Sequence, residues 1–256
     1  MKGLITSILS ICPLRSQPDD SSEMISQVLF GEQAEVLEKY KENWIKIRLI
    51  NDQYVGWADQ KQFVSIESRS DSAPSILSYE LFHNVFSDDA STWITLGAEL
   101  HDYDGITANV GSKNFRFSGQ VIRPEQFVEK AEAIEKMSKR LLNAPYLWGG
   151  RSPFGIDCSG FTQLIFKCVG IAIARDSSDQ ALSGQMIDFV SSAQCGDLAF
   201  FTKKTDKISH VGIVLPDNQI IHASGKVRID TLDHYGIFNN EIQQYTHRLK
   251  IIKRYI

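Results

Sequence analysis

The pattern of apolar and polar positions changes along the chain and divides it into three regions. In residues 1–66, short apolar runs are separated by turn residues roughly every 8 to 12 positions, a spacing typical of small β domains. In Trp44–Leu49 apolar and polar side chains alternate, as in a half-buried strand. We therefore predict a small β-barrel over residues 1–66, with a first strand over Ile8–Leu14.

The next stretch predicts a linker and a second β region. Glu67–Ser75 is rich in serine and contains a proline, a composition that favours a loop. Residues 76–123 again contain short apolar runs, such as Thr92–Leu96, punctuated by glycines. This pattern favours a second, more diverged β-barrel over residues 76–123, and the alternative is an irregular insertion.

The third region, residues 124–256, begins with a helical pattern and ends with strands. Pro124 is expected to open a helix, because apolar residues recur at helical spacing over Phe127–Leu142 with charges opposite. From Ala193 onward, short apolar runs separated by turns indicate strands. A helix-rich half followed by a meander predicts an α+β domain over residues 124–256.

Composition and charge narrow the classes of partner. Of the 256 residues, 43% are hydrophobic and 23% charged, which is ordinary for a soluble globular protein. The net charge of -4 provides no basic excess for nucleic-acid phosphates. No apolar run approaches the roughly 18 residues needed to span a bilayer. We therefore expect neither a nucleic-acid nor a membrane partner.

The cysteines and the N-terminal residues indicate the cellular compartment in which the protein is expected to lie. Cys12, Cys158, Cys168 and Cys195 are irregularly spaced, which favours free thiols in a reducing compartment over disulfides. Residues 1–11 superficially resemble an export leader, but polar residues interrupt them and no small-residue cleavage site follows. We expect a β-strand here and a cytoplasmic protein. An exported protein is the alternative, if this stretch is a cleaved leader.

One cysteine has the local sequence of a nucleophile. Asp157 is a good helix N-cap, and the apolar spacing that follows indicates a helix that stops at Gly170. Cys158 would then lie in the first turn, where the helix dipole favours the reactive thiolate. Cys168 instead falls on the apolar face of the same helix and fits a buried structural thiol.

Two histidines form a candidate base and its partner. The alternating segment Ile208–Val214 contains His210, and Pro216–Asn218 then predicts a tight turn. The returning strand, Gln219–Ser224, contains His222, so a hairpin would bring the two histidines close together. A thiol nucleophile needs a base, and the base needs a third polar group to fix its tautomer.

These residues belong to a longer series of motifs over about residues 127–235. The motifs are Tyr146-x-Trp148-Gly149-Gly150, Asp157-Cys158-Ser159-Gly160, Arg175-x-Ser177-x-x-Gln180, Gly196-Asp197-Leu198-x-Phe200-Phe201 and His210-Val211-Gly212-Ile213. The series resembles the NlpC-type, papain-like cysteine peptidases of bacterial peptidoglycan metabolism. Near the N-terminus, Trp44-x-x-Ile47-Arg48 and Tyr54-x-Gly56-Trp57-Ala58 resemble a bacterial SH3-like domain. The implied fold is a papain-like cysteine peptidase domain preceded by two small SH3-like β-barrels.

The resemblance implies roles for single residues. Cys158 would be the nucleophile, His210 the base and His222 the orienting residue, with Tyr146 near the oxyanion site. Trp148, Ser159 and Ser177 would line the substrate pocket. Cys195 departs from the family, which usually has proline before the Gly196-Asp197 motif.

The resemblance also implies a substrate. The family cleaves the amide between γ-linked D-glutamate and a diamino acid. The arrangement of SH3-like modules before the peptidase is similar to the subgroup that recycles murein peptides with a free N-terminal L-alanine. Asp157, together with an acidic residue and a tyrosine of the first SH3-like domain, would then hold the amine. Glu23 and Tyr54 are the candidates, and no metal or organic cofactor is expected.

Other functions are compatible with parts of this pattern. The same fold could act as an amidase or acyltransferase on another amide. A cell-wall binding module is a second alternative, although a pure binder has no need for a cysteine and two histidines in this arrangement. A zinc site formed by Cys158, Cys195 and the histidines is a third.

Overall fold

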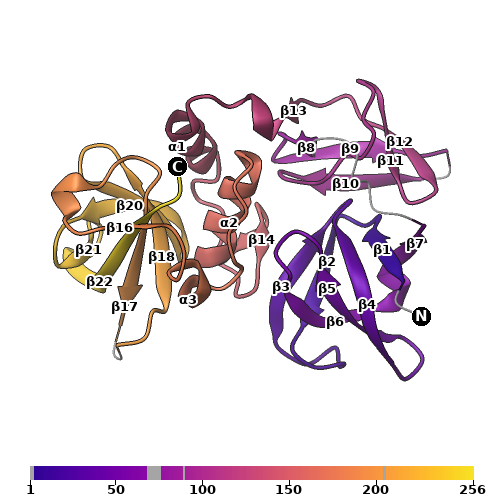
Figure 1. Cartoon of the computed structure of the whole chain (residues 1–256), viewed down its shortest axis with the longest axis horizontal. Coiled ribbons are helices and arrows are strands. Elements are labelled where there is room, and N and C mark those ends of the chain that lie inside the picture. The colour runs from indigo at the N-terminus through magenta and orange to yellow at the C-terminus, as the bar shows by residue number, and fades with distance from the viewer. Residues whose placement is uncertain (1–2, 68–75, 89, 204–205) are drawn as a thin grey trace. The chain divides into compact units, whose positions relative to one another are not determined.

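The computed structural model describes residues 3–67, 76–88, 90–203 and 206–256. Its contacts divide the chain into two compact units (Figure 1). Unit 1 comprises Met1–Gln126 and Trp148–Pro153, and unit 2 comprises Phe127–Leu147 and Phe154–Ile256. The predicted linker lies almost wholly outside the described residues, and the predicted boundaries at residues 66, 76 and 123 stay predictions.

The first part of unit 1 is an antiparallel sheet around an apolar core. In sheet order its strands are β3 (Met24–Leu29), β2 (Ile11–Arg15), β6 (Val55–Asp59), β5 (Trp44–Leu49), β4 (Gln33–Tyr40), β1 (Leu4–Ser7) and β7 (Phe63–Ile66). The predicted first strand, Ile8–Leu14, is wrong in its start. The chain turns after Ser7, whose hydroxyl accepts a hydrogen bond from the Leu9 N–H, and pairing resumes at Ile11.

The second part of unit 1 has its own sheet and core. The strand order is β10 (Ser91–Thr95), β9 (Phe82–Phe86), β12 (Lys113–Arg116) and β11 (Thr107–Val110), and β8 (Leu77–Ser78) pairs with β13 (Val121–Ile122). Phe30, from the first part, packs into this core edge-on against Phe115. Asn51 also donates to Glu99 at 2.5 Å, so side chains tie the two parts of unit 1 together.

A short segment from the middle of the chain, Trp148–Pro153, packs within unit 1, although the sequence placed it in the third region. Its strand β14 (Arg151–Ser152) contacts β3. The Arg151 guanidinium donates to both carboxylate oxygens of Glu32 at 2.9 Å, and its backbone N–H donates to Gln27 at 2.7 Å. Gly149 has φ of +77°, and a Cβ there would lie 2.3 Å from the Met24 carbonyl oxygen.

Unit 2 starts with helices. They are α1 (Lys130–Arg140), α2 (Cys158–Cys168) and α3 (Ser177–Gln180), with the short strand β15 (Gly155–Ile156) before α2. The helix predicted over Phe127–Leu142 is confirmed only in its centre, and Pro124 opens a separate 3-10 turn, Pro124–Gln126. The other 3-10 turns of the described chain are Gln60–Gln62 and Val190–Ser192.

The rest of unit 2 is an antiparallel sheet closed on itself. In sheet order its strands are β16 (Gln185–Ile187), β22 (Gln244–Arg254), β17 (Leu198–Thr202), β18 (His210–Leu215), β19 (Gln219–Ser224), β20 (Lys226–Leu232) and β21 (Gly236–Asn239). The long strand β22 pairs with both β17 and β21, which closes the sheet around an apolar core.

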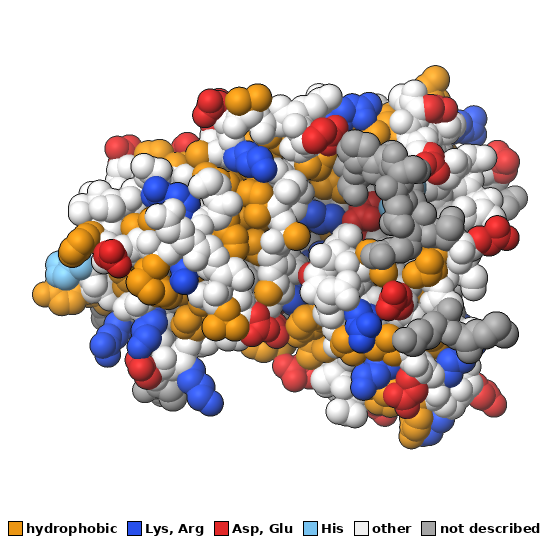
Figure 2. Space-filling model, viewed as in Figure 1, with side chains coloured by type: hydrophobic (Ala, Val, Ile, Leu, Met, Phe, Trp, Pro, Cys, Tyr) orange, Lys and Arg blue, Asp and Glu red, His pale blue; other side chains and the backbone are white. Residues whose placement is uncertain are grey.

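Sheet predominates over helix in the described chain, so the α+β class stays a prediction. None of the helices in the part of the chain that the structure describes has the length and the apolar character of a bilayer-spanning segment. Figure 2 shows acidic and basic side chains interspersed on the visible face, an arrangement that builds no strong field of one sign there.

Candidate active site

The candidate nucleophile stands at the first position of α2. Asp157 caps this helix, and its carboxylate accepts a hydrogen bond from the Gly160 N–H at 2.7 Å. Gly170 follows the helix with φ of +74°, a conformation that glycine adopts without strain and that ends helices. The local sequence therefore placed Cys158 correctly, because both helix signals lie within a few residues of it.

The thiol of Cys158 is buried, and this sets its protonation. Burial, followed by the negative charge of Asp157, raises its pKa to about 11, although the Val211 and Ser159 N–H groups act in the opposite direction. Burial thus outweighs the effect of the helix dipole, which was expected to favour the thiolate. The resting sulfur is therefore a neutral thiol. Attack then requires a base to remove its proton.

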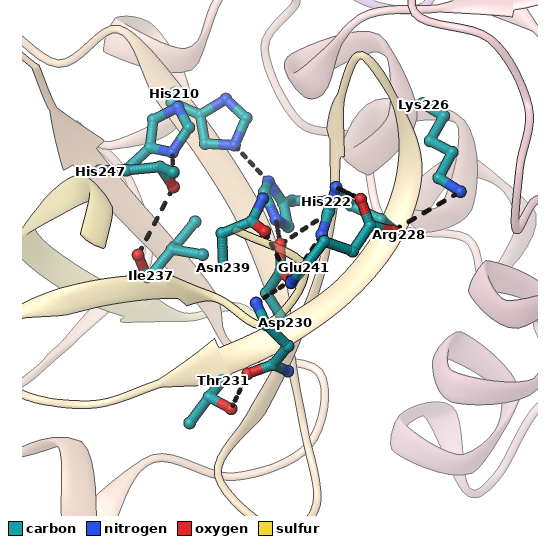
Figure 3. Close-up of polar contacts among 12 residues, drawn as sticks. His210, His222, Lys226, Arg228, Asp230, Thr231, Ile237, Asn239, Glu241 and His247 are labelled. Carbon is teal, nitrogen blue, oxygen red and sulfur yellow. Dashed lines mark hydrogen bonds and ion pairs between the residues drawn. The ribbon is translucent and has the colours of Figure 1, made fainter. Parts of the chain in front are cut away.

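The two histidines meet on the predicted hairpin. His210 begins β18, and on the neighbouring strand β19 the paired partner of Gly212 is His222. A Cβ at Gly212 would lie 2.8 Å from side-chain carbons of Ile220 and 2.9 Å from the His222 Cβ, so glycine allows the side chains of β19 to approach β18 closely. The His210 Nε2 and His222 Nδ1 atoms are 2.8 Å apart (Figure 3). The turn between the strands contains two residues with positive φ, Asp217 and Asn218.

The chain of polar contacts continues to a carboxylate that the sequence did not single out. His222 Nε2 lies 3.1 Å from Asp230 Oδ2, and Arg228 Nε donates to the same oxygen at 2.7 Å (Figure 3). Burial alone would raise the pKa of Asp230, but hydrogen bonds from His222 and Arg228 hold it well below its ordinary value. Burial lowers the pKa of both His210 and His222, so both imidazoles are neutral at pH 7.

A third histidine stacks on the candidate base. The rings of His247 and His210 are 4.1 Å apart between centroids and inclined by only 22° (Figure 3). His247 comes from β22, and its Nδ1 lies 2.9 Å from the Thr246 hydroxyl. Burial lowers its pKa to about 3, so it presents a neutral ring. Sequence reasoning missed this residue, because β22 is brought to β18 through its pairing with β17, over a long separation in sequence.

Asp157 has a second partner besides the helix. Arg175 donates to Asp157 Oδ2 at 2.6 Å and to Oδ1 at 3.1 Å, and also to the Ser159 hydroxyl at 2.9 Å. All three side chains are buried. The predicted amine-binding and pocket residues, Asp157 and Ser159, thus belong to one network around Arg175. The motif Arg175-x-Ser177 contained this arginine, but its spacing alone did not reveal its partner.

Two further predicted residues lie in unit 2. Burial, followed by the charges of Cys158 and Asp157, raises the pKa of Tyr146 to about 12. Its phenol therefore stays protonated, and its backbone bridges Ile156, two residues before Cys158. Ser177 is half-buried at the first position of α3.

The remaining predicted residues lie in unit 1. The Trp148 indole N–H donates to the Glu23 carboxylate at 2.6 Å, and the Trp148 side chain is 58% exposed. Tyr54 is half-buried and packs against the core of the first sheet. Unit 1 thus pairs Glu23 with Trp148, two residues 125 positions apart in sequence.

The other three thiols differ from Cys158 in their surroundings. All four cysteines are free, as predicted. Burial raises the pKa of Cys12 to about 11 and that of Cys168 to about 12. Cys195 is half-exposed beside Glu135, and its pKa is also raised to about 11, first by burial. Of the four, only Cys158 stands at the first position of a helix, and backbone N–H groups act to lower the pKa of its thiol.

Comparison with known proteins gives consistent matches. A model of the NlpC/P60 family matches residues 143–246, and one of the bacterial dipeptidyl-peptidase Sh3 domain matches residues 14–63. A gamma-D-glutamyl-L-lysine dipeptidyl-peptidase of Bacillus cereus is 30% identical over 230 residues, which cover 80% of this chain and 68% of that protein. The Bacillus subtilis protein of that name is 32% identical over 216 residues, with 77% and 71% covered.

A solved structure supports the fold. The crystal structure of an NlpC/P60 family protein from Bacillus cereus matches with a TM-score of 0.81 at 23% sequence identity. The match covers 98% of this chain and 99% of that one, which shows that the two have the same fold.

Proposed function

Because the chain belongs to the NlpC/P60 family, we propose that it is a cysteine peptidase that hydrolyses the γ-D-glutamyl–diamino acid bond of murein peptides. One observation carries this proposal. Helix α2, which begins at Cys158, packs against strand β18, which begins at His210, and His210 is hydrogen-bonded to His222. A helix-capped thiol and a supported imidazole thus come from adjoining elements, which is the arrangement that nucleophilic catalysis by cysteine requires.

The reaction follows from the protonation of these groups. His210 removes the proton of the Cys158 thiol as the sulfur attacks the amide carbonyl carbon. N–H groups at the start of α2 and the Tyr146 hydroxyl stabilise the developing oxyanion. His210 then protonates the leaving amine, the C–N bond breaks, and a thioester remains on the sulfur. Water, activated by His210, hydrolyses the thioester and restores the thiol.

The finer specificity is part of the same proposal. Two relatives are named for the γ-D-glutamyl-L-lysine bond and for release of dipeptides. We assign to this chain murein peptides with a free N-terminal L-alanine and a recycling role in the cytoplasm. The exposed Glu23 carboxylate, held by Trp148, is chemically suited to an ammonium group. Asp157, its charge shared with Arg175, and Tyr54 are the further candidates for the amine, and Ser159 and Ser177 for the pocket.

The SH3-like part of the chain belongs to this assignment. Residues 14–63 form an SH3-like domain. We extend the description to residues 76–123 as a diverged second barrel. The small antiparallel sheet of that region, with a core of its own, supports this extension.

Digestion of defined peptides tests the proposal. Tripeptides L-Ala-γ-D-Glu-diamino acid, with the N-terminus free or acetylated, are incubated with the intact protein and with Cys158→Ala, and products are identified by mass spectrometry. Release of L-Ala-D-Glu by the intact protein from the free peptide alone is the expected result. Cleavage of both peptides would refute the amine requirement. Cleavage of neither, with turnover of another amide or acyl donor, would favour an amidase or acyltransferase.

A further inference from the structure

The carboxylate of Asp230 lies at the end of the histidine chain and is fully buried. It sits on β20 and accepts from His222 Nε2, from Arg228 Nε and Nη2, and from the Asn240 N–H. These contacts surround both oxygens, Oδ1 and Oδ2, with N–H groups. The low pKa of Asp230 keeps it ionised, and an ionised carboxylate can only accept hydrogen bonds.

This single constraint determines where the protons of both histidines lie. Because Asp230 only accepts, the Nε2 atom of His222 must carry a proton. His222 is neutral, so its Nδ1 is bare and accepts a hydrogen bond. The donor across the 2.8 Å contact is then His210 Nε2–H. His210 is neutral as well, so its Nδ1 carries no proton and can act as a base.

We propose that Asp230 is a positioning residue that fixes the tautomers of His222 and His210 and leaves the His210 Nδ1 unprotonated. Asp230 is 0% exposed, so it acts on the reaction only through the two imidazoles. The inference rests on the proposed function for the role of His210 as base.

Arg228 completes the arrangement. Its guanidinium forms a two-point ion pair with Asp230, at 2.7 and 3.0 Å. The positive charge of Arg228 disfavours a second positive charge on His222. Asp230 therefore fixes the proton on His222 Nε2 without converting this ring to imidazolium. The cation that forms when His210 takes the thiol proton is then stabilised through the His222 bond.

The variant Asp230→Asn replaces a group that only accepts hydrogen bonds with one that can donate, at almost unchanged side-chain volume. If the asparagine oxygen accepts from Arg228 Nη2 and the Asn240 N–H, as Asp230 Oδ1 does, the amide NH2 faces His222 and donates to it. This favours a bare Nε2 on His222 and a proton on Nδ1. His222 Nδ1–H would then donate to His210 Nε2, and the His210 proton would move to Nδ1. Asp230→Glu retains an acceptor-only group and keeps the original tautomers.

Nitrogen NMR of histidine-labelled protein tests the tautomers without reference to activity. The spectra are recorded on Cys158→Ala protein, alone and combined with Asp230→Asn or Asp230→Glu, at a pH where the rings are neutral. We expect His210 to be protonated on Nε2 in the parent and in Asp230→Glu, and on Nδ1 in Asp230→Asn. A proton on His210 Nδ1 in the parent would overturn the proposal, whether or not the protein cleaves murein peptides.

Kinetics with the tripeptide give the second readout. A wrong tautomer of the base costs about 10⁴-fold in kcat in a serine peptidase, so for Asp230→Asn we expect a loss of at least about 100-fold in kcat. The matched control is Asp233→Asn, a carboxylate in the turn after β20 that accepts from Tyr245 and from the Tyr235 N–H. Turnover of Asp230→Asn within about threefold of the parent, with a native circular dichroism spectrum and unchanged histidine signals, would also overturn the proposal.

Discussion

Each unit contains an arginine paired with a buried carboxylate, and the two pairs differ in what they hold. In unit 1, Arg151 and Glu32 close on each other through two hydrogen bonds, and the arginine belongs to a segment that returns from the middle of the chain. In unit 2, Arg228 and Asp230 form a similar pair, but the carboxylate also accepts from His222. The pair in unit 1 holds a backbone segment in place, whereas the pair in unit 2 fixes the position of the proton on His222.

The largest effect is expected at His210, the proposed base at one end of the series of hydrogen bonds in unit 2. Replacing His210 by alanine removes the base, and general-base catalysis contributes about 10²- to 10⁴-fold, so kcat on the tripeptide should fall by that factor. The fold should persist, because the substitution leaves the strand pairing of β18 intact. His234→Ala, at an exposed position of the same unit, is the control and should retain parental kcat. Equal losses in the two variants would contradict the assignment of His210.

The corresponding change in unit 1 should affect stability. Glu32→Gln removes the ion-pair partner of the buried Arg151 guanidinium, and breaking such a pair costs about 3–5 kcal/mol. The free energy of unfolding of unit 1 should fall by this amount in urea titrations. Glu35→Gln, in an exposed pair with Arg48, should cost less than about 1 kcal/mol. If the two variants were equally stable, the buried pair would not anchor the segment.

The pH dependence of stability tests a third buried group of unit 2, the His247 imidazole. The pKa of His247 drops from its ordinary 6.5 to about 3 on folding, so unfolding takes up a proton between these pH values. Stability is therefore lost as the pH falls from about 6.5 towards 3. His247→Phe keeps a stacking ring without a proton site. It should flatten the slope of unfolding free energy by up to about 1.4 kcal/mol per pH unit. An unchanged slope in thermal unfolding between pH 4 and pH 6 would contradict this.

The smallest effect is expected at the exposed hydrogen bond of unit 1. Trp148→Phe removes the indole N–H that orients Glu23 but keeps an aromatic ring. Stability should change by less than about 1.5 kcal/mol, the usual contribution of one hydrogen bond. KM for the free-amine tripeptide should rise several-fold with kcat nearly constant. A change in kcat with constant KM would argue against a binding role.

The features that could be predicted from the sequence are local. The cap at Asp157, the start of α2 at Cys158 and the hairpin that joins His210 to His222 each depend on a few neighbouring residues. The motif series also identified the family, because its members occur in order over one stretch of chain.

The features that were missed depend on contacts distant in sequence. Asp230 joins the site through the register of β20 on β19, and His247 through the pairing of β22 with β17. Arg228 and Asp230 alternate with the apolar Val227 and Ile229 of β20, a pattern that indicates a solvent-facing side of a strand, so the sequence carried no signal that Asp230 is buried. The neutral state of Cys158 could not be predicted either. Burial of the thiol outweighs the helix dipole, and the extent of this burial depends on the surrounding fold.

The most direct test is the mass of the protein during turnover. The reaction with free-amine tripeptide is quenched in acid at short times, and the intact protein and its proteolytic fragments are weighed. We predict an adduct equal to L-Ala-D-Glu less one water, carried by the fragment with Cys158 and absent from Cys158→Ala. An adduct on Cys12, Cys168 or Cys195, or cleavage of the tripeptide by Cys158→Ala, would contradict the account.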